Sequence, residues 1–223
     1  MCCVLTYDHP HRKTQDLLSI LKLKGYEVFV VGTPWIEKKI ARPLLEHKPG
    51  SKRHIKDVCS ALGYSYEVSG DLLSYFNVRK PELVLVGAAG ILPEDVVRNF
   101  TIINSHPGYL PYCRGLDALK WSLYEDLPVG VTTHILDKNV DMGRLIRRVK
   151  TPIGPDNAFG DIARRHYDLE VSLLADAAED IKNAPRTELS GTESRIHGRM
   201  PRPVEIELKR KLDKIYWEHS EKI

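Results

Sequence analysis

Two short segments in the middle of the chain carry side chains that suit a reaction at a carbonyl group. Residues 104–111 contain Asn104 and His106, and residues 130–143 contain His134 and Asp141. An amide can donate a hydrogen bond to an oxyanion, an imidazole can transfer a proton, and a carboxylate can orient the imidazole. Together, the four side chains predict a site for chemistry at a carbonyl carbon.

Each of these residues also has an ordinary structural explanation. Asn104 is of a type that favours turns, and His106 before Pro107 could be a simple loop residue. His134 lies in an apolar run, where a satisfied core histidine is the commoner case, and Asp141 could belong to an ordinary turn. We assign them to one site because they occur together.

The composition is that of an ordinary soluble globular protein. The chain has 223 residues, 42% of them apolar and 28% charged, with a net charge of +3. This length suits one sizeable domain or a domain with an appendage, and the charge is too small to indicate nucleic acid on its own. No apolar run approaches the roughly 20 residues of a membrane helix, and no signal pattern opens the chain. We therefore expect a cytoplasmic protein that binds neither nucleic acid nor membrane.

Four cysteines, at positions 2, 3, 59 and 113, form no CxxC pair. A zinc site is therefore not expected, and we predict no metal. Buried or half-buried thiols in a reducing compartment explain the cysteines best.

Apolar runs alternate with amphipathic stretches over the first 125 residues. Strands are predicted at residues 2–6, 27–31, 64–68, 83–88 and 101–104, and helices at residues 14–24, 51–62 and from Pro93 onward. This alternation predicts an α/β fold with a mostly parallel sheet and helices on both faces.

The pattern changes after residue 125. Residues 130–136 and 144–153 are two predicted strands joined by a loop alone, which favours an antiparallel pair. A long helix follows over residues 157–182. Residues 184–203 read as an extended segment, and a last helix over 204–219 carries apolar side chains that include Leu208, Leu212 and Ile215.

We divide the chain into a catalytic domain, residues 1–183, and a C-terminal extension, residues 184–223. The apolar stripe of the last helix needs a partner surface, either the core or a second subunit, so we expect a homodimer.

In an open α/β sheet, ligands bind beyond the carboxyl ends of the strands. Asn104 and His106 lie where the predicted strand 101–104 ends, and Asp141 lies in the loop after the predicted strand 130–136, so we expect the three to meet at one rim of the sheet.

A larger motif surrounds these residues. It reads Asn104-x-His106-Pro107 with Leu110-Pro111 and Arg114-Gly115 behind it, then Gly130-Val131-Thr132-x-His134, then Val140-Asp141-x-Gly143. Over about residues 80 to 155, this pattern resembles the formyltransferase family that uses 10-formyltetrahydrofolate. That family includes glycinamide ribonucleotide formyltransferase, methionyl-tRNA formyltransferase and the sugar-nucleotide N-formyltransferases. The resemblance implies a Rossmann-like formyltransferase fold.

The resemblance also implies roles for individual residues. A primary amine would attack the formyl carbon of the folate, with Asn104 and His106 stabilising the oxyanion. His106, or a water held by Asp141, would transfer protons, and His134 would support the site. Two loops would bind the folate co-substrate; the predicted residues are Gly87, Ala88, Ala89, Gly90, Ile91, Leu92, His134, Asn139 and Val140.

The acceptor is predicted less directly. The segment from His9 to Thr14 precedes a helix, whose N-terminus can bind anions. It lacks the glycine-rich phosphate loop of glycinamide ribonucleotide formyltransferase, and only about 40 residues follow residue 183, which argues against the tRNA enzyme. We expect a nucleotide-linked amino-deoxy sugar as substrate. The predicted substrate-binding residues are His9, Arg12, Lys13, Tyr109 and Arg114.

Three alternatives remain open at this point. The same groups could activate water in a formyltetrahydrofolate hydrolase, or serve a glycinamide ribonucleotide formyltransferase with an unusual phosphate loop. The chain could also be a folate- or nucleotide-binding module without catalysis.

Overall fold

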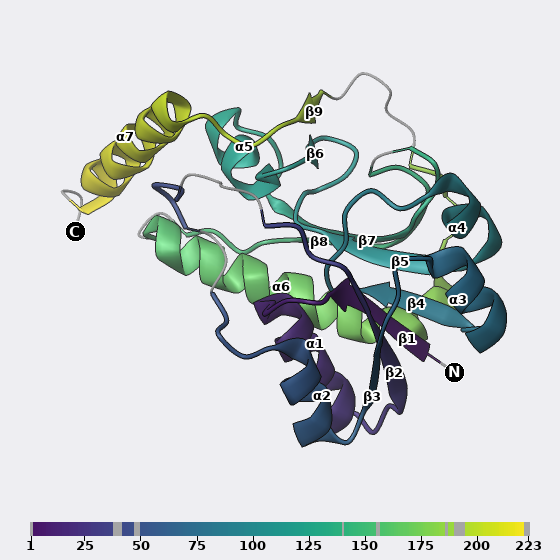
Figure 1. The fold of residues 1–223 in the computed structure, drawn as a ribbon. Helices are drawn as coiled ribbons and strands as arrows, with labels where there is room; N and C mark the ends of the chain where they lie inside the picture. The colour runs from purple at the N-terminus through teal and green to yellow at the C-terminus, as the bar shows by residue number, and fades with distance from the viewer. Residues whose placement is uncertain are drawn as a thin grey trace.

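A seven-stranded sheet in the order β3-β2-β1-β4-β5-β7-β8 forms the centre of the computed structural model (Figure 1). The structure describes residues 2–37, 42–46, 50–139, 141–154, 157–185, 187–189 and 195–220, the last seven of these as backbone only. The strands are β1 (Cys2–Tyr7), β2 (Val28–Thr33), β3 (Ser65–Val68), β4 (Leu83–Val86), β5 (Ile102–His106), β7 (Gly130–Ile135) and β8 (Arg144–Lys150).

Strands β3, β2, β1, β4 and β5 run parallel to one another. Strand β7 is antiparallel to β5, and β8 is antiparallel to β7. The predicted α/β fold, with a mostly parallel sheet and an antiparallel pair late in the chain, is therefore confirmed. The antiparallel pairing of β5 with β7 was not predicted, and it determines where the candidate site forms.

Helices cover both faces of the sheet, as the alternating pattern predicts. Helices α1 (Arg12–Leu23), α2 (Ile55–Leu62) and α6 (Phe159–Asp180) pack on one face, where Val4 of β1 is buried. Helices α3 (Leu72–Arg79) and α4 (Glu94–Asn99) pack on the other, against Cys3 and Leu5. Successive residues of β1 thus point to opposite faces and enter separate cores.

Some elements were missed by the sequence patterns. Helix α3 reads LLSYFNVR, which has little amphipathic contrast; it is capped by Asp71, whose side chain accepts a hydrogen bond from Ser74 N. Helix α5 (Ala118–Tyr124) is short, and strands β6 (Arg114–Gly115) and β9 (Ile196–His197) have two residues each. Elements this short carry no detectable periodicity.

The C-terminal extension packs against the rest of the chain. After the 3-10 helix η1 (Ile181–Asn183), β9 pairs with β6, and α7 (Arg202–Ser220) follows. Leu208 and Met200 are buried beside Leu45, with Leu212 packed against this cluster. The homodimer and the division into two domains stay predictions. Among the described residues, no helix has both the length and the apolar character to cross a membrane.

Candidate functional site

The antiparallel pair β5–β7 carries three of the four predicted site side chains. Asn104 lies opposite His134, and His106 lies opposite Thr132. Residues two apart on a strand share a face, and directly opposite residues share it too. Ile102 belongs to the core beneath α3 and α4, so Asn104 and His106 lie on that same face. Asn104, His106 and His134 therefore form a patch on one face of the sheet.

Asp141 reaches this patch by a route that the sequence prediction had wrong. Because β7 is antiparallel to β5, its carboxyl end lies beside Ile103, at the start of β5, not at the rim where β5 ends. The loop after β7 instead folds back over the sheet. Left-handed backbone at Asp141 (φ 51°) and Gly143 (φ 100°) makes this reversal possible.

The loop brings the Asp141 carboxylate to His106. Asp141 Oδ1 lies 3.3 Å from His106 Nδ1, and the two side chains are 12% and 4% exposed. Gly115 N donates to Asp141 Oδ2 at 2.7 Å, and His106 Nε2 donates to Cys113 O at 3.0 Å. Both ring nitrogens face acceptor oxygens, which a doubly protonated imidazolium satisfies on both edges.

Gly108 presses against this imidazole. A Cβ atom at Gly108 would lie 2.6 Å from both His106 Nε2 and Cys113 O, closer than such atoms approach in proteins. The hydroxyl of Thr132 holds the same loop, donating to Gly108 O at 2.8 Å and accepting from Leu110 N at 3.0 Å. The His106 ring is thus held by backbone on two sides.

His134 is fully buried beside this pair. Its Nδ1–H donates to Met142 O at 2.9 Å. Burial, together with the nearby charge of His106, lowers the pKa of His134 to about 4, so the ring is neutral at pH 7. Its Nε2 then carries a lone pair, and no group among the described residues donates to it. The structure therefore brings Asn104, His106, His134 and Asp141 together.

The predicted folate loop after β4 divides into a packed part and an exposed part. A Cβ at Gly87 would lie 2.7 Å from Thr14 Oγ1, so packing against α1 accounts for this glycine. The amides of Gly87 and Ala88 both donate to Leu5 O. Further along, Gly90 is exposed and Ile91 is 91% exposed. Ala89 and Leu92 pack partly against the core beneath α3 and α4.

The second predicted folate loop precedes Asp141. Asn139 N donates to Asp137 Oδ1 at 2.8 Å and its side chain to Oδ2 at 3.2 Å, so half-buried Asp137 and exposed Asn139 form a local turn. Val140 lies outside the described residues.

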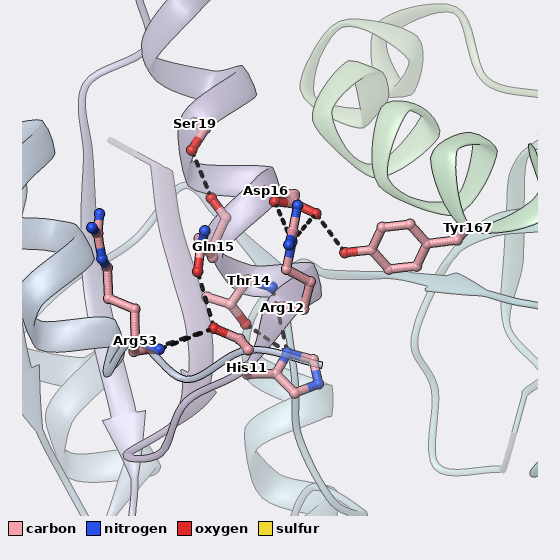
Figure 2. A network of polar contacts seen from close by, with 9 residues as sticks. His11, Arg12, Thr14, Gln15, Asp16, Ser19, Arg53 and Tyr167 are labelled. Carbon is pink, nitrogen blue, oxygen red and sulfur yellow. Dashed lines mark hydrogen bonds and ion pairs between the residues drawn. The ribbon is translucent and has the colours of Figure 1, made fainter. Parts of the chain in front are cut away.

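The basic residues at the start of α1 are engaged within the protein, which corrects the expectation that Lys13 meets a substrate. Lys13 is 6% exposed; its Nζ lies 2.8 Å from Glu170 Oε1 and donates to Ser105 O at 3.0 Å. Figure 2 shows Arg12 bonded to Asp16, which also accepts from Tyr167 at 2.8 Å. Arg12 stays partly exposed, whereas Lys13 ties α1 to α6 and β5.

The other predicted substrate residues have different surroundings. His9 is exposed and stacks on Trp35, with ring centroids 4.9 Å apart and planes 16° apart. Tyr109 is half-buried beneath the guanidinium of Arg148, at 5.0 Å. Arg114 is 7% exposed in β6, so its side chain lies in the interior.

Sequence reasoning missed two contributors to the site. Trp35 is 39% exposed just after β2 and also meets Tyr7 edge-on at 4.7 Å, which makes an aromatic cluster at the carboxyl ends of β1 and β2. A lone tryptophan in a loop gives no pattern to detect. Gly115 acts through its backbone N–H, and a backbone donor has no signature in residue type.

A cysteine nucleophile and a metal centre have little support near the site. Burial raises the pKa of the Cys113 thiol to about 11, and its Sγ faces Ala118 O, so it is no ready nucleophile beside His106. Within the described ranges, no cluster of three or more His, Cys, Asp or Glu side chains could hold a metal. A cavity of about 260 Å³ between α5, α7 and the segment that joins β8 to α6 includes none of the predicted site residues.

Comparison with known proteins places this geometry in context. The formyl transferase family model matches residues 34–178, well over half of the chain. A methionyl-tRNA formyltransferase from Syntrophus aciditrophicus is 35% identical over 112 residues, which cover 48% of this chain and 36% of that protein. The chain thus spans about a third of the length of the curated relatives it matches.

Solved structures share the fold at low sequence identity. A sugar N-formyltransferase from a Shewanella species superposes with a TM-score of 0.64 at 21% identity, covering 89% of this chain and 77% of that one. The formyltransferase PseJ from Anoxybacillus kamchatkensis, solved with UDP-4,6-dideoxy-4-formamido-L-AltNAc and tetrahydrofolate, gives 0.59 at 20% identity, covering 89% and 86%. Identity this low establishes the shared fold alone.

Proposed function

The chain belongs to the formyl transferase family, and we propose that it transfers the formyl group of 10-formyltetrahydrofolate to the primary amine of a nucleotide-linked amino-deoxy sugar. The observation that carries this proposal is the buried His106–Asp141 pair. It is oriented by the Gly115 amide and Cys113 carbonyl, with Asn104 and neutral His134 beside it. Such a set combines proton transfer with hydrogen-bond donors for a developing oxyanion.

The chemistry divides among these residues. When bound, 10-formyltetrahydrofolate would supply the formyl carbon that the amine attacks. Asn104 donates to the formyl oxygen as negative charge develops there. His106 supplies a second donor when its Nε2–H leaves Cys113 O and donates to the formyl oxygen instead. The Asp141 carboxylate, through a water, accepts the proton of the attacking amine as the new C–N bond forms, and His106 gives its Nε2 proton to the departing folate nitrogen as the old C–N bond breaks; transfer of the proton from Asp141 to His106 restores the pair.

The residues present fit a folate. A pterin-like ring is flat, and its edge carries both donors and acceptors. His134 Nε2 is a buried acceptor for which the described residues provide no donor, and its neutral state at pH 7 preserves that lone pair. Gly90 and Ile91 offer an exposed backbone edge and an exposed apolar side chain nearby along the sheet rim. These groups would bind and orient the ring.

The acceptor would be held by aromatic stacking in place of the predicted lysine contact. Lys13 is buried, so Arg12 is the remaining basic side chain of that pair with exposure to solvent. Trp35, stacked with His9, presents an aromatic surface at the carboxyl ends of the parallel strands, where ligands bind in this fold class. A nucleobase stacks well on such a surface. This feature supports a nucleotide-linked acceptor.

The test is a turnover assay with 10-formyltetrahydrofolate and a panel of acceptors. Amino-deoxy sugars linked to UDP and dTDP, glycinamide ribonucleotide and water alone would be compared, with products identified by mass spectrometry. We expect a formamido sugar from at least one nucleotide-linked amino sugar.

Each other outcome points to one alternative. Formate released at the same rate with and without acceptors would indicate a hydrolase, and formylated glycinamide ribonucleotide alone would indicate the purine enzyme. Folate binding without any turnover would indicate a binding module. Each of these results would refute the sugar-nucleotide proposal.

A further inference from the structure

We propose that two described parts of the C-terminal extension, residues 187–189 and 195–205, together called the strap, position the His106–Asp141 pair, with His197 as the main positioning residue. This inference rests on the proposed function, because it takes His106 and Asp141 as the catalytic pair. It assigns a catalytic purpose to the C-terminal extension, which the sequence suggested only for packing or dimerisation.

One end of the strap is bonded to the loop that carries Asp141. Leu189 N donates to Gly143 O at 2.8 Å, and Leu145 N donates to Thr187 O at 2.9 Å. Leu189 is 6% exposed, so this contact is packed as well as hydrogen-bonded. Gly143 follows Asp141 by two residues, at the point where the loop turns back into β8.

The other end is bonded to the segment that faces both members of the pair. In the parallel β6–β9 pairing, Gly115 lies opposite His197, and Leu116 N donates to His197 O at 2.9 Å. Gly115 is also the residue whose amide donates to Asp141, and Cys113, two residues earlier, accepts from His106. β9 therefore supports the one short segment that holds both ring and carboxylate.

Gly115 fits beneath β9 because it has no side chain. A Cβ atom there would collide with His197 O and lie 2.9 Å from His197 N, and its φ of 88° is one that side chains disfavour. The two backbones are thus in direct contact, so a shift of β9 is transmitted to the Gly115 amide. Figure 1 shows β6 and β9 together, above the β5–β7 part of the sheet.

The side chain of His197 anchors the strap to α5. It is buried, its Nε2–H donates to Glu125 Oε1 at 3.1 Å, and its ring lies 4.6 Å from the ring of Trp121. Trp121 in turn donates from Nε1 to Gly198 O at 2.9 Å. Removing the imidazole would leave β9 held mainly by its short backbone pairing.

A buried ion cluster fixes the strap beyond this point. Met200 N donates to Asp117 Oδ2 at 3.0 Å. Lys120 Nζ lies 2.8 Å from both Asp117 Oδ2 and Glu205 Oε1, with its side chain 1% exposed. The strap is therefore attached at several points to the segment between Cys113 and α5, and at its other end to the Asp141 loop.

The test compares three variants in the full chain. His197→Ala removes the anchor, and His197→Gln keeps an N–H that can reach Glu125. Lys211→Ala is the matched control, because Lys211 ties α7 to Leu123 O, Tyr124 O and Asp126. Among the described residues, these bonds involve neither the Asp141 loop nor the segment 113–116. Rates are measured well below every unfolding midpoint, so that loss of stability does not enter.

We expect His197→Ala to lower kcat by roughly 10- to 100-fold, the scale of a misplaced catalytic group, with KM changed little. His197→Gln restores most of kcat, and Lys211→Ala stays within about two-fold of the parent protein. A kcat for His197→Ala no lower than that of Lys211→Ala would overturn the proposal, because His197 would then be merely structural.

A second readout separates this proposal from the proposed function. With ¹⁵N-labelled histidine, the imidazole resonances of His106 report its two hydrogen-bond partners without any substrate. We expect them to shift in His197→Ala and not in Lys211→Ala. In uniformly ¹⁵N-labelled protein, we expect the Gly115 amide to exchange at least about 10-fold faster in His197→Ala than in the parent. Unchanged resonances and exchange would refute the strap. A parent protein that formylates no acceptor would refute the function, while the NMR comparison would still decide the strap.

Discussion

Replacing Asp141 by Asn tests the catalytic pair most directly. The substitution keeps the size of the side chain and an oxygen that can accept from Gly115 N. It replaces the oxygen that faces His106 Nδ1, 3.3 Å away, with an amide N–H2 group. A donor facing Nδ1 forces the neutral Nε2–H tautomer, which still donates to Cys113 O. The fold is kept, whereas the pair can no longer hold a shared proton beside a carboxylate.

The distance sets the size of the effect. Opposite unit charges 3.3 Å apart attract by about 5 kcal/mol at an effective dielectric constant of about 20. At 1.36 kcal/mol for each factor of ten, this limits the loss to roughly 5,000-fold. Loss of a single hydrogen-bond donor at an oxyanion costs about 100- to 1,000-fold. We therefore expect kcat to fall by about 1,000-fold, with KM for both substrates nearly unchanged.

The measurement is a single-turnover reaction in rapid quench, with the formylated product quantified by mass spectrometry. Asp137→Asn is the matched control, since Asp137 is a carboxylate of the same loop whose hydrogen bonds within the described residues go to Asn139. We expect it to keep nearly full activity. If Asp141→Asn retains more than a tenth of the parent rate, or if both variants lose activity equally, the pairing of His106 with Asp141 is not the catalytic device.

Three further substitutions test other parts of the molecule. Gly108→Ala should lower kcat by about 100-fold without unfolding the protein, because the added Cβ would lie 2.6 Å from His106 Nε2; steady-state rates and circular dichroism decide this. Trp35→Ala should raise KM for the nucleotide sugar by about 10-fold while kcat is unchanged, and Trp35→Phe should recover most of the loss. Glu205→Gln should lower the free energy of unfolding at pH 7 by about 3 kcal/mol, measured by urea denaturation, because it leaves the buried Lys120 with one carboxylate fewer. Burial alone would raise the pKa of Glu205, but hydrogen bonds from Leu44 N and Lys120 and the charge of Lys120 lower it overall. The stabilisation by ionised Glu205 is therefore complete above pH 4.5 and disappears as pH falls through the lowered pKa. A difference between parent and variant that persists at pH 2 would contradict this account.

The fold was largely predictable because its signals are local. The apolar run at Leu83–Val86 and the Gly63 cap of α2, with φ of 74°, follow from residue types and their spacing. The pairing of β5 with β7 could not be read in this way, because no pattern within either strand specifies the direction of its neighbour. The assumption that β7 ends at the same rim as β5 failed for that reason, although the loop after β7 does bring Asp141 to His106, the last residue of β5.

The candidate site was predictable only as far as side chains define it. Asn104, His106, His134 and Asp141 are polar residues in a pattern, so the sequence could nominate them. Lys13 looked available for a substrate because its sequence neighbours are basic and polar. Its partner Glu170 lies 157 positions away on α6, and nothing in the local sequence indicates that burial.

The site on the sheet face has a structural requirement that a site at the rim would not have. A loop that leaves the far end of β7 and folds back across the sheet needs support beyond the bond from His134 Nδ1 to Met142 O. Gly115 N and the bond from Leu189 N to Gly143 O supply that support from two other segments. One of these is the C-terminal extension itself, and the other is paired with it through His197. On the proposed function, we therefore expect changes in that extension to alter catalysis without any contact to substrate.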